Sequence, residues 1–214
     1  MDRKFLHEHL HDNIDSILDK RIAILGCGAL GANLTLSLAR RGFKNFNLID
    51  YDKIEEHNFS TQPWLIQDLH RLKAKTLSRM IYSFNTKASG STNITRVVTK
   101  DTMISILITS DLIVDCFDNS KSRALAQFAH LEKGRAVIHA GMSNQNTGEV
   151  RWAENYIVPP DVELDDPCNY PLSRTLIELV VIATSEAVIK YLKHGIKFNY
   201  FVNANNLKIT GGLV

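Results

Sequence analysis

The sequence predicts an α/β fold with a mostly parallel central sheet, helices on both faces and a short C-terminal antiparallel extension. Three observations support this prediction. Short, almost continuously apolar runs alternate with longer segments of helical spacing. A glycine-rich turn joins the first apolar run to a helical segment, and two short strand-like runs stand near the end of the chain. Strands that alternate with helices at this spacing favour βαβ units and a parallel sheet.

The elements follow one another in a regular order. Residues 1–20 predict a helical N-terminal lead-in, and residues 21–214 predict a single domain. The runs that predict strands are 21–25, 46–50, 94–99, 111–117, 135–141 and 149–153, with two shorter runs at 200–203 and 207–210. The segments that predict helices are 30–41, 69–84, 102–108, 120–133 and 172–192. The stretch 155–170 is rich in Pro and Asp and predicts a loop.

Composition narrows the function classes. The 214 residues carry 25 basic and 23 acidic side chains, so no nucleic-acid partner is indicated. The sequence has no apolar run of about 18 residues or more, and its charged N-terminus lacks the apolar region of a secretion signal, so no membrane partner is expected. Three widely spaced cysteines argue against a disulfide framework and for a reducing compartment. These features predict a cytoplasmic protein with one core.

The sequence GCGALG contains Gly26, Gly28 and Gly31 between the first strand and the first long helix. Such glycines allow a tight turn, close approach of a phosphate and close packing of helix on strand. Asp50 ends the second strand, where a carboxylate can bind ribose hydroxyls. The pattern predicts a Rossmann-like nucleotide site. These residues alone fit a nicotinamide or flavin dehydrogenase equally well.

Three later features favour a triphosphate. First, Asp52 stands two residues after Asp50 and is followed by the amides Asn58 and Gln62. Second, Lys73 begins a helical segment. Third, the pair Asp118–Asn119 follows the fourth strand. Because open α/β sheets bind ligands at the carboxyl ends of their strands, these groups are expected to converge near the glycine turn. A cation and a metal-binding carboxylate suit ATP with Mg²⁺, and a dehydrogenase needs neither.

Four motifs in order resemble those of the ThiF/MoeB/HesA superfamily of ubiquitin-like-protein activators: GCGALG, DYDKIEEHNFSTQ, KAKTLSRMIYSFN and DCFDNSKSR. The similarity runs from about residue 21 to residue 192. The resemblance implies a Rossmann-like fold and assigns a role to each matching residue. By this resemblance Asp50 binds the ribose. Asn58, Gln62 and Lys73 contact the phosphates, with Asp52 beside them. Asp118 binds the magnesium ion, supported by Asn119 and Arg123.

The activity implied by this resemblance is ATP- and Mg²⁺-dependent adenylation of the C-terminal glycine carboxylate of a ubiquitin-like protein, with Lys73 and Asp118 as catalytic residues. Transfer to a cysteine thioester would follow, with a conjugating enzyme as a further partner and a homodimer as the expected assembly. Three alternatives stay open: a sulfur-carrier adenylyltransferase for thiamine- or molybdopterin-type cofactor synthesis, an NAD-dependent oxidoreductase, and a nucleotide-binding scaffold without catalytic activity.

Cys168 is the candidate for the thioester. It stands in DDPCNYPLSR, just before the last long helix, and resembles the cysteine segment of ubiquitin activators. A helix N-terminus lowers the pKa of a thiol, whereas the neighbouring Asp165 and Asp166 oppose ionisation. The alternative interpretation is a loop cysteine without chemistry. Cys27 and Cys116 are interpreted as small core residues.

One position departs from the family pattern. Many members have an arginine immediately before the glutamine of the second motif, and this chain has Thr61 there. A cationic contact to the triphosphate is therefore missing at this position, and Arg3, Lys20 or Lys75 are candidates to replace it. The cysteine pairs of the zinc-bearing members are missing as well.

Overall fold

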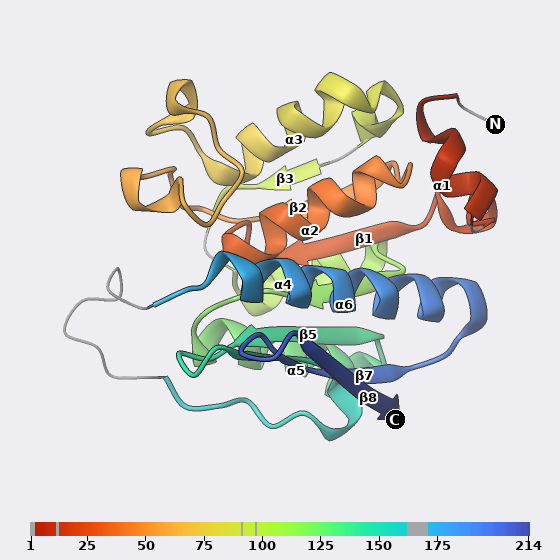
Figure 1. The fold of residues 1–214 in the computed structure, drawn as a ribbon, viewed down its shortest axis with the longest axis vertical. Helices are drawn as coiled ribbons and strands as arrows, with labels where there is room; N and C mark the ends of the chain where they lie inside the picture. Colours follow the sequence, from red (N-terminus) through yellow and green to blue (C-terminus); the bar gives the residue numbers. More distant parts are fainter. Residues whose placement is uncertain (1–2, 12, 91, 97, 162–170) are drawn as a thin grey trace.

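The computed structural model describes residues 3–11, 13–90, 92–96, 98–161 and 171–214, and within them eight strands form one sheet (Figure 1). The strand order is β3-β2-β1-β4-β5-β6-β7-β8. Neighbouring strands from β3 to β5 pair in parallel, whereas those from β5 to β8 pair antiparallel. The predicted fold class, with its antiparallel C-terminal extension, is therefore confirmed.

The central strands β1, β2, β4 and β5 coincide closely with the apolar runs, because a strand of a covered sheet buries both of its faces. The bounds of the strands are β1 (Arg21–Leu25), β2 (Asn45–Ile49), β3 (Thr92–Ile94), β4 (Leu112–Asp115), β5 (Val137–Met142), β6 (Thr147–Trp152), β7 (Phe198–Asn203) and β8 (Lys208–Leu213).

The helices also follow their predicted segments, and capping residues set several of their ends. Their bounds are α1 (Leu6–His11), α2 (Ala29–Arg40), α3 (Lys73–Phe84), α4 (Lys100–Thr109), α5 (Ser120–Lys133) and α6 (Arg174–His194). Asn119 and Ser173 accept hydrogen bonds from the first turns of α5 and α6, while Gly134 and Gly195 end these helices in the left-handed conformation. No helix in the described ranges is both long and apolar enough to cross a membrane.

The prediction for β3 was wrong in its position. The apolar run predicts a strand over 94–99, but the strand ends at Ile94. The hydroxyl of Thr99 instead accepts a hydrogen bond from the backbone N–H of Thr102 and caps α4. A threonine that caps a helix has left the sheet, and this local competition shortens the strand.

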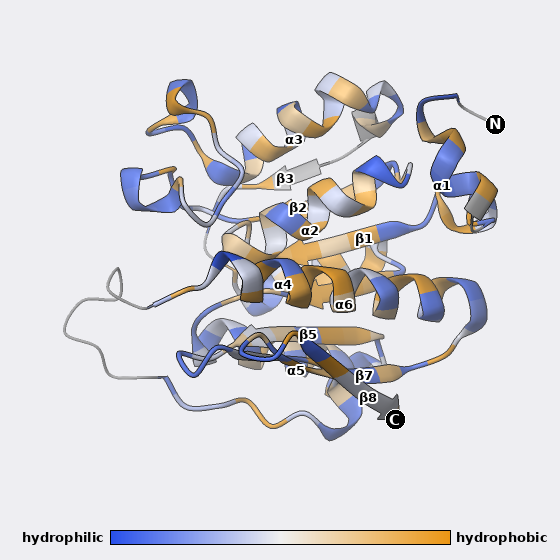
Figure 2. Ribbon diagram, in the orientation of Figure 1, coloured by the Kyte–Doolittle hydropathy of each residue, from blue (hydrophilic) through white to orange (hydrophobic). Residues whose placement is uncertain are grey.

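The two faces of the sheet have separate cores, because successive strand side chains point to opposite sides. Ile22 and Ile24 of β1 belong to the core formed with α2, α3 and α6. Ala23 and Leu25 belong to the core formed with α4 and α5. Figure 2 shows β1 and β5 largely in orange, as expected for strands that are covered on both faces. The apolar side of α6 is thus core.

The topology places the candidate site. The order of the parallel strands reverses between β1 and β4, which are paired neighbours. In Figure 1 the turn from β1 into α2, the orange segment 51–72 and the beginning of α6 all lie toward the left side of the molecule. A crevice at such a switch point is where open α/β sheets bind their ligands.

Candidate functional site

Two glycines of the turn after β1 are required by packing. Gly26 has φ +89°, and a Cβ at this residue would lie 2.9 Å from the carbonyl oxygen of Cys116. A Cβ at Gly31 would lie 1.8 Å from the carbonyl oxygen of Gly26, so only glycine lets α2 pack this closely on the turn. The backbone N–H of Gly26 also donates to Ile49 at the end of β2 (2.8 Å).

Gly28 is different, because a Cβ there would meet nothing within 4 Å. It is the N-cap residue of α2 and has no side chain to satisfy the first N–H groups of the helix. Open space beside the N-terminal end of a helix is the arrangement that binds phosphate, through free N–H donors and the helix dipole. The geometry of the turn therefore fits the predicted nucleotide site.

The end of β2 carries a linked group of charges. Asp50 is buried, and its two carboxylate oxygens accept hydrogen bonds from the N–H groups of Cys27 and Asp52, both at 2.7 Å. Burial raises the pKa of Asp50, while the two N–H donors oppose that shift. Lys73 Nζ lies 3.3 Å from Asp52 Oδ2, and its backbone N–H donates to the Asp52 carbonyl (2.9 Å). The lysine and the glycine turn are thus joined through these two acids.

Asn58 and Gln62 are buried in the loop that follows β2, and both have local partners. The Asn58 side-chain oxygen accepts from the backbone N–H of Glu55 (3.0 Å). The Gln62 side-chain oxygen accepts from the indole N–H of Trp64 (2.7 Å), and this indole is itself buried. The two amides hold the loop in shape, and their contact with phosphate stays a prediction.

The end of β4 presents an exposed acid. Asp118 accepts a hydrogen bond from the amide of Asn119 (3.2 Å), and the role of this pair at a magnesium ion stays a prediction. Asn119 also caps α5 by accepting from Ser122 N (2.9 Å). Asp161 accepts hydrogen bonds from both the backbone N–H and the hydroxyl of Ser120, so residues far apart in the chain meet at this helix end.

Arg123 does not support Asp118 in the described part of the chain, contrary to the prediction. Its guanidinium donates to the Tyr156 hydroxyl (2.9 Å) and the Ala140 carbonyl (3.2 Å) and lies 3.7 Å from Asp115. It faces the interior because Asp115 is fully buried and needs a counter-charge there.

Sequence reasoning missed this buried polar network. Asp115 and His139 are partners in the register of β4 and β5, and His139 Nδ1 lies 2.7 Å from Asp115 Oδ2. The other ring nitrogen of His139 lies 2.9 Å from the Gln127 side-chain oxygen, and Tyr156 stacks on the ring at 3.8 Å. The sequence signal for this network was a polar residue in each of two apolar strands, Asp115 in β4 and His139 in β5.

The cysteines divide into two groups. Cys27 is fully buried and Cys116 is partly covered, and burial raises the pKa of both thiols. Neither is therefore suited to act as a nucleophile, which agrees with their interpretation as core residues. Cys168 lies outside the described residues, so its thioester role stays a prediction.

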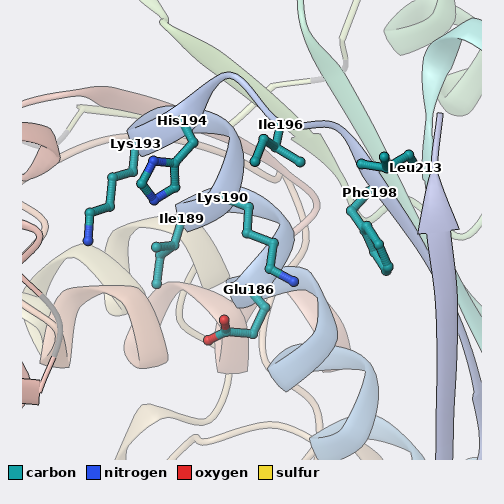
Figure 3. Close-up of a pocket in the computed structure, with 8 residues that line it drawn as sticks. All are labelled: Glu186, Ile189, Lys190, Lys193, His194, Ile196, Phe198 and Leu213. Carbon is teal, nitrogen blue, oxygen red and sulfur yellow. The ribbon is translucent and has the colours of Figure 1, made fainter.

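Two other features lie away from the site. Lys20 pairs with Asp111 (3.3 Å) at the opposite end of β1 and β4, so it does not replace the missing arginine. A shallow groove lies between the last turns of α6 and the C-terminal hairpin (Figure 3). Basic and apolar side chains line it, including Lys190, Ile196 and Phe198, but none of the predicted site residues does.

The described residues hold no group of three or more His, Cys, Asp or Glu side chains that could bind a metal ion unaided. A magnesium ion at this site would therefore need ligands from the nucleotide as well as from the protein. That is the usual arrangement for Mg²⁺ bound with nucleotide phosphates, which takes one or two carboxylates. The exposed carboxylate of Asp118 fits this requirement, since no cation pairs with it within the described ranges.

Comparison with known proteins gives consistent matches. The model of the ThiF family matches residues 2–162. The "Adenylyltransferase and sulfurtransferase MOCS3" of Dictyostelium discoideum is 29% identical over 124 residues, which are 58% of this chain and 29% of that protein. The "Ubiquitin-like modifier-activating enzyme 5" of Drosophila grimshawi is 28% identical over 150 residues, which are 64% of this chain and 38% of that protein. The chain thus spans well under half the length of these relatives.

Solved structures share the fold. E. coli MccB crystallised with succinimide has a TM-score of 0.80 and 16% identity, and the match covers 100% of this chain and 72% of MccB. E. coli MccB with ATP has a TM-score of 0.79 and 17% identity over the same shares. PaaA has a TM-score of 0.74 and 15% identity over 92% of this chain and 65% of its own.

Proposed function

Because this chain belongs to the ThiF family of adenylyltransferases, we propose that it uses ATP and Mg²⁺ to adenylate the C-terminal glycine carboxylate of a ubiquitin-like protein. The carboxylate oxygen attacks the α-phosphorus of ATP, an acyl-adenylate forms, and pyrophosphate leaves. The observation that carries the proposal is the meeting of the glycine turn and the exposed Asp118 at the ends of two paired strands, β1 and β4, where the strand order reverses. Lys73 lies at the same edge, on the β2 side.

Each residue has a distinct task in this reaction. The open N-terminal end of α2 at Gly28 receives phosphate, and Asp50 holds the ribose while its own position is fixed by two backbone N–H groups. Lys73 provides positive charge near the phosphates, with Asp52 orienting its ammonium group. Asp118, supported by Asn119, would hold Mg²⁺, which neutralises charge on the leaving pyrophosphate. Catalysis is then positioning and electrostatics.

The partner class rests on the relatives. One is named a ubiquitin-like modifier-activating enzyme, and another is named an adenylyltransferase and sulfurtransferase. We propose conjugation through a thioester at Cys168 as the first fate of the adenylate, with a conjugating enzyme as recipient and a homodimer as the working assembly. Sulfur transfer from the same adenylate is the second candidate, which the name of the first relative favours.

ATP–pyrophosphate exchange with Gly-terminated β-grasp proteins tests the adenylation step. We expect the wild-type chain and Cys168→Ala to catalyse exchange and Asp118→Asn to lose it. The matched control is Asp111→Asn, which removes another exposed acid, at the opposite end of β4. Absence of exchange in the wild-type chain, or a thermal shift with NAD in place of ATP, would refute the proposal, and exchange that survives Asp118→Asn would refute the magnesium role of Asp118.

A second measurement separates the two fates. A partner adduct that dithiothreitol releases, and that Cys168→Ala does not form, supports the thioester. An adenylate that only a persulfide donor consumes, with full activity in Cys168→Ala, supports sulfur transfer.

A further inference from the structure

Arg174 is the first residue of α6, and its guanidinium reaches back to the loop that follows β2. Its Nη1 donates to the Thr61 carbonyl oxygen (3.3 Å). The amide of Asn33 donates to this same oxygen (3.0 Å) and to the carbonyl of Ala29 (2.7 Å), the first residue of α2. A short series of hydrogen bonds therefore joins Arg174 to the helix end where the phosphates are expected.

The charge at this edge of the sheet favours such a cation. Three carboxylates, those of Asp50, Asp52 and Asp118, follow β2 and β4. Under the proposed function Mg²⁺ would neutralise Asp118, but Lys73 shares its charge with Asp52, and Arg123 faces a buried carboxylate behind the site. A further cation would therefore strengthen the binding of a triphosphate, which is itself strongly negative.

Arg174 has the freedom to provide that charge. Its side chain is 49% exposed, and its Nε donates to Glu178 Oε1 (3.0 Å) one helical turn further on. This pair fixes one side of the guanidinium, and among the described residues Nη2 has no hydrogen-bond partner. A guanidinium held on one side and open on the other is suited to bidentate contact with a phosphate group.

We propose that Arg174 is a further substrate-contacting residue that binds the phosphates of ATP, an inference that rests on the proposed function. Glu178 and the Thr61 carbonyl hold the guanidinium beside the N-terminal end of α2. The residue lies well after the nucleotide motifs in the chain, at the start of a helix that packs on α2. α6 therefore contributes a group to the nucleotide site besides covering the sheet.

Binding of ATP and of adenosine, measured by calorimetry on the full chain, tests this role. We expect Arg174→Ala to raise the Kd for ATP about tenfold, the scale of one charge-assisted contact, and to leave the Kd for adenosine unchanged. Arg174→Lys should recover part of the loss, and the ATP effect should shrink at high salt. The matched control is Arg151→Ala, since Arg151 is also exposed and its Nε also donates to a glutamate at 3.0 Å.

The remaining outcomes are decisive. If Arg174→Ala weakens ATP and adenosine equally, or lowers the thermal midpoint together with both affinities, the residue only shapes the loop and the inference fails. If the variant binds ATP as the wild type does, the inference fails while the proposed function stands. If the wild type itself binds no ATP, the proposed function fails, and the inference fails with it.

Discussion

The ends of β2 and β4 carry similar residues but pair them in opposite ways. Two acids stand at or just after the end of each strand, and each end has one lysine or arginine nearby. At β2 the first acid, Asp50, is satisfied by backbone N–H groups, and Lys73 pairs with the second, half-exposed acid, Asp52. The side chain of Lys73 is 10% exposed and that of Asp52 is 51% exposed, so the cation at this end is paired with an acid at the surface.

At β4 the cation lies inside. Arg123 and His139 both pair with the first acid, Asp115, which is fully buried. The second acid, Asp118, is exposed and keeps an amide neighbour only, within the described residues. The comparison teaches that the position of the cation decides whether a strand end presents a positive or a negative group to a ligand. One end offers a positive group to a ligand, and the other offers a negative group suited to a metal ion.

The largest expected effect is on stability at the β4 end. Asp115→Asn leaves the buried Arg123 without its counter-charge and should lower the free energy of unfolding by about 3–5 kcal/mol. Asp118→Asn, at an exposed position three residues later, should change it by less than about 0.5 kcal/mol. Urea unfolding of both variants measures the difference. Similar losses in the two would show that the buried pair does not organise this strand end.

A smaller effect with a defined pH dependence is expected at the β2 end. Asp50→Asn places an amide donor against one of two backbone N–H groups and should cost about 1–3 kcal/mol. Burial raises the pKa of Asp50, so the folded protein binds a proton there more tightly than the unfolded chain does. The charged form thus costs the wild type stability above the usual carboxyl range, and this cost disappears as the pH falls.

The variant lacks that cost. Its stability deficit relative to the wild type should therefore shrink as the pH rises from about 4 to about 7. Unfolding measured across this range would contradict the assignment if the deficit stayed constant or grew.

The smallest expected effect concerns the pair of Lys73 and Asp52. A double-mutant cycle with Lys73→Met and Asp52→Asn should give a coupling energy below about 1 kcal/mol, because water screens the half-exposed Asp52 even though the Lys73 side chain is only 10% exposed. A coupling above about 2 kcal/mol would mean that Lys73 is committed to Asp52 and is not available to phosphate. Measured by unfolding without nucleotide, the cycle sharpens the contrast with the buried pair.

Local signals explain what the sequence could predict. Gly26 and Gly31 stand where a positive φ or a close approach excludes any side chain, and apolar runs mark strands that are buried on both faces. The candidate site followed from these signals because topology brings the strand ends together.

Side-chain contacts that depend on strand register or on the packing of distant helices could not be predicted from local patterns. The pairing of Asp115 with His139 depends on the alignment of β4 with β5, which no local pattern encodes. The contact of Arg174 with the Thr61 carbonyl depends on how α6 packs across α2. The end of β3 was missed for the converse reason, since the capping hydroxyl of Thr99 overrides an apolar run.

The packing of α6 on α2 also bears on how the chain is made. The helix supplies apolar side chains to the core that Leu34 and Leu38 of α2 share with the strands, yet it leaves the ribosome after all five parallel strands have emerged. Until then one face of the nascent sheet has no cover along much of its length. An incomplete chain therefore exposes an apolar surface that is prone to aggregation, and its folding depends on the synthesis of α6, which comes late in the chain.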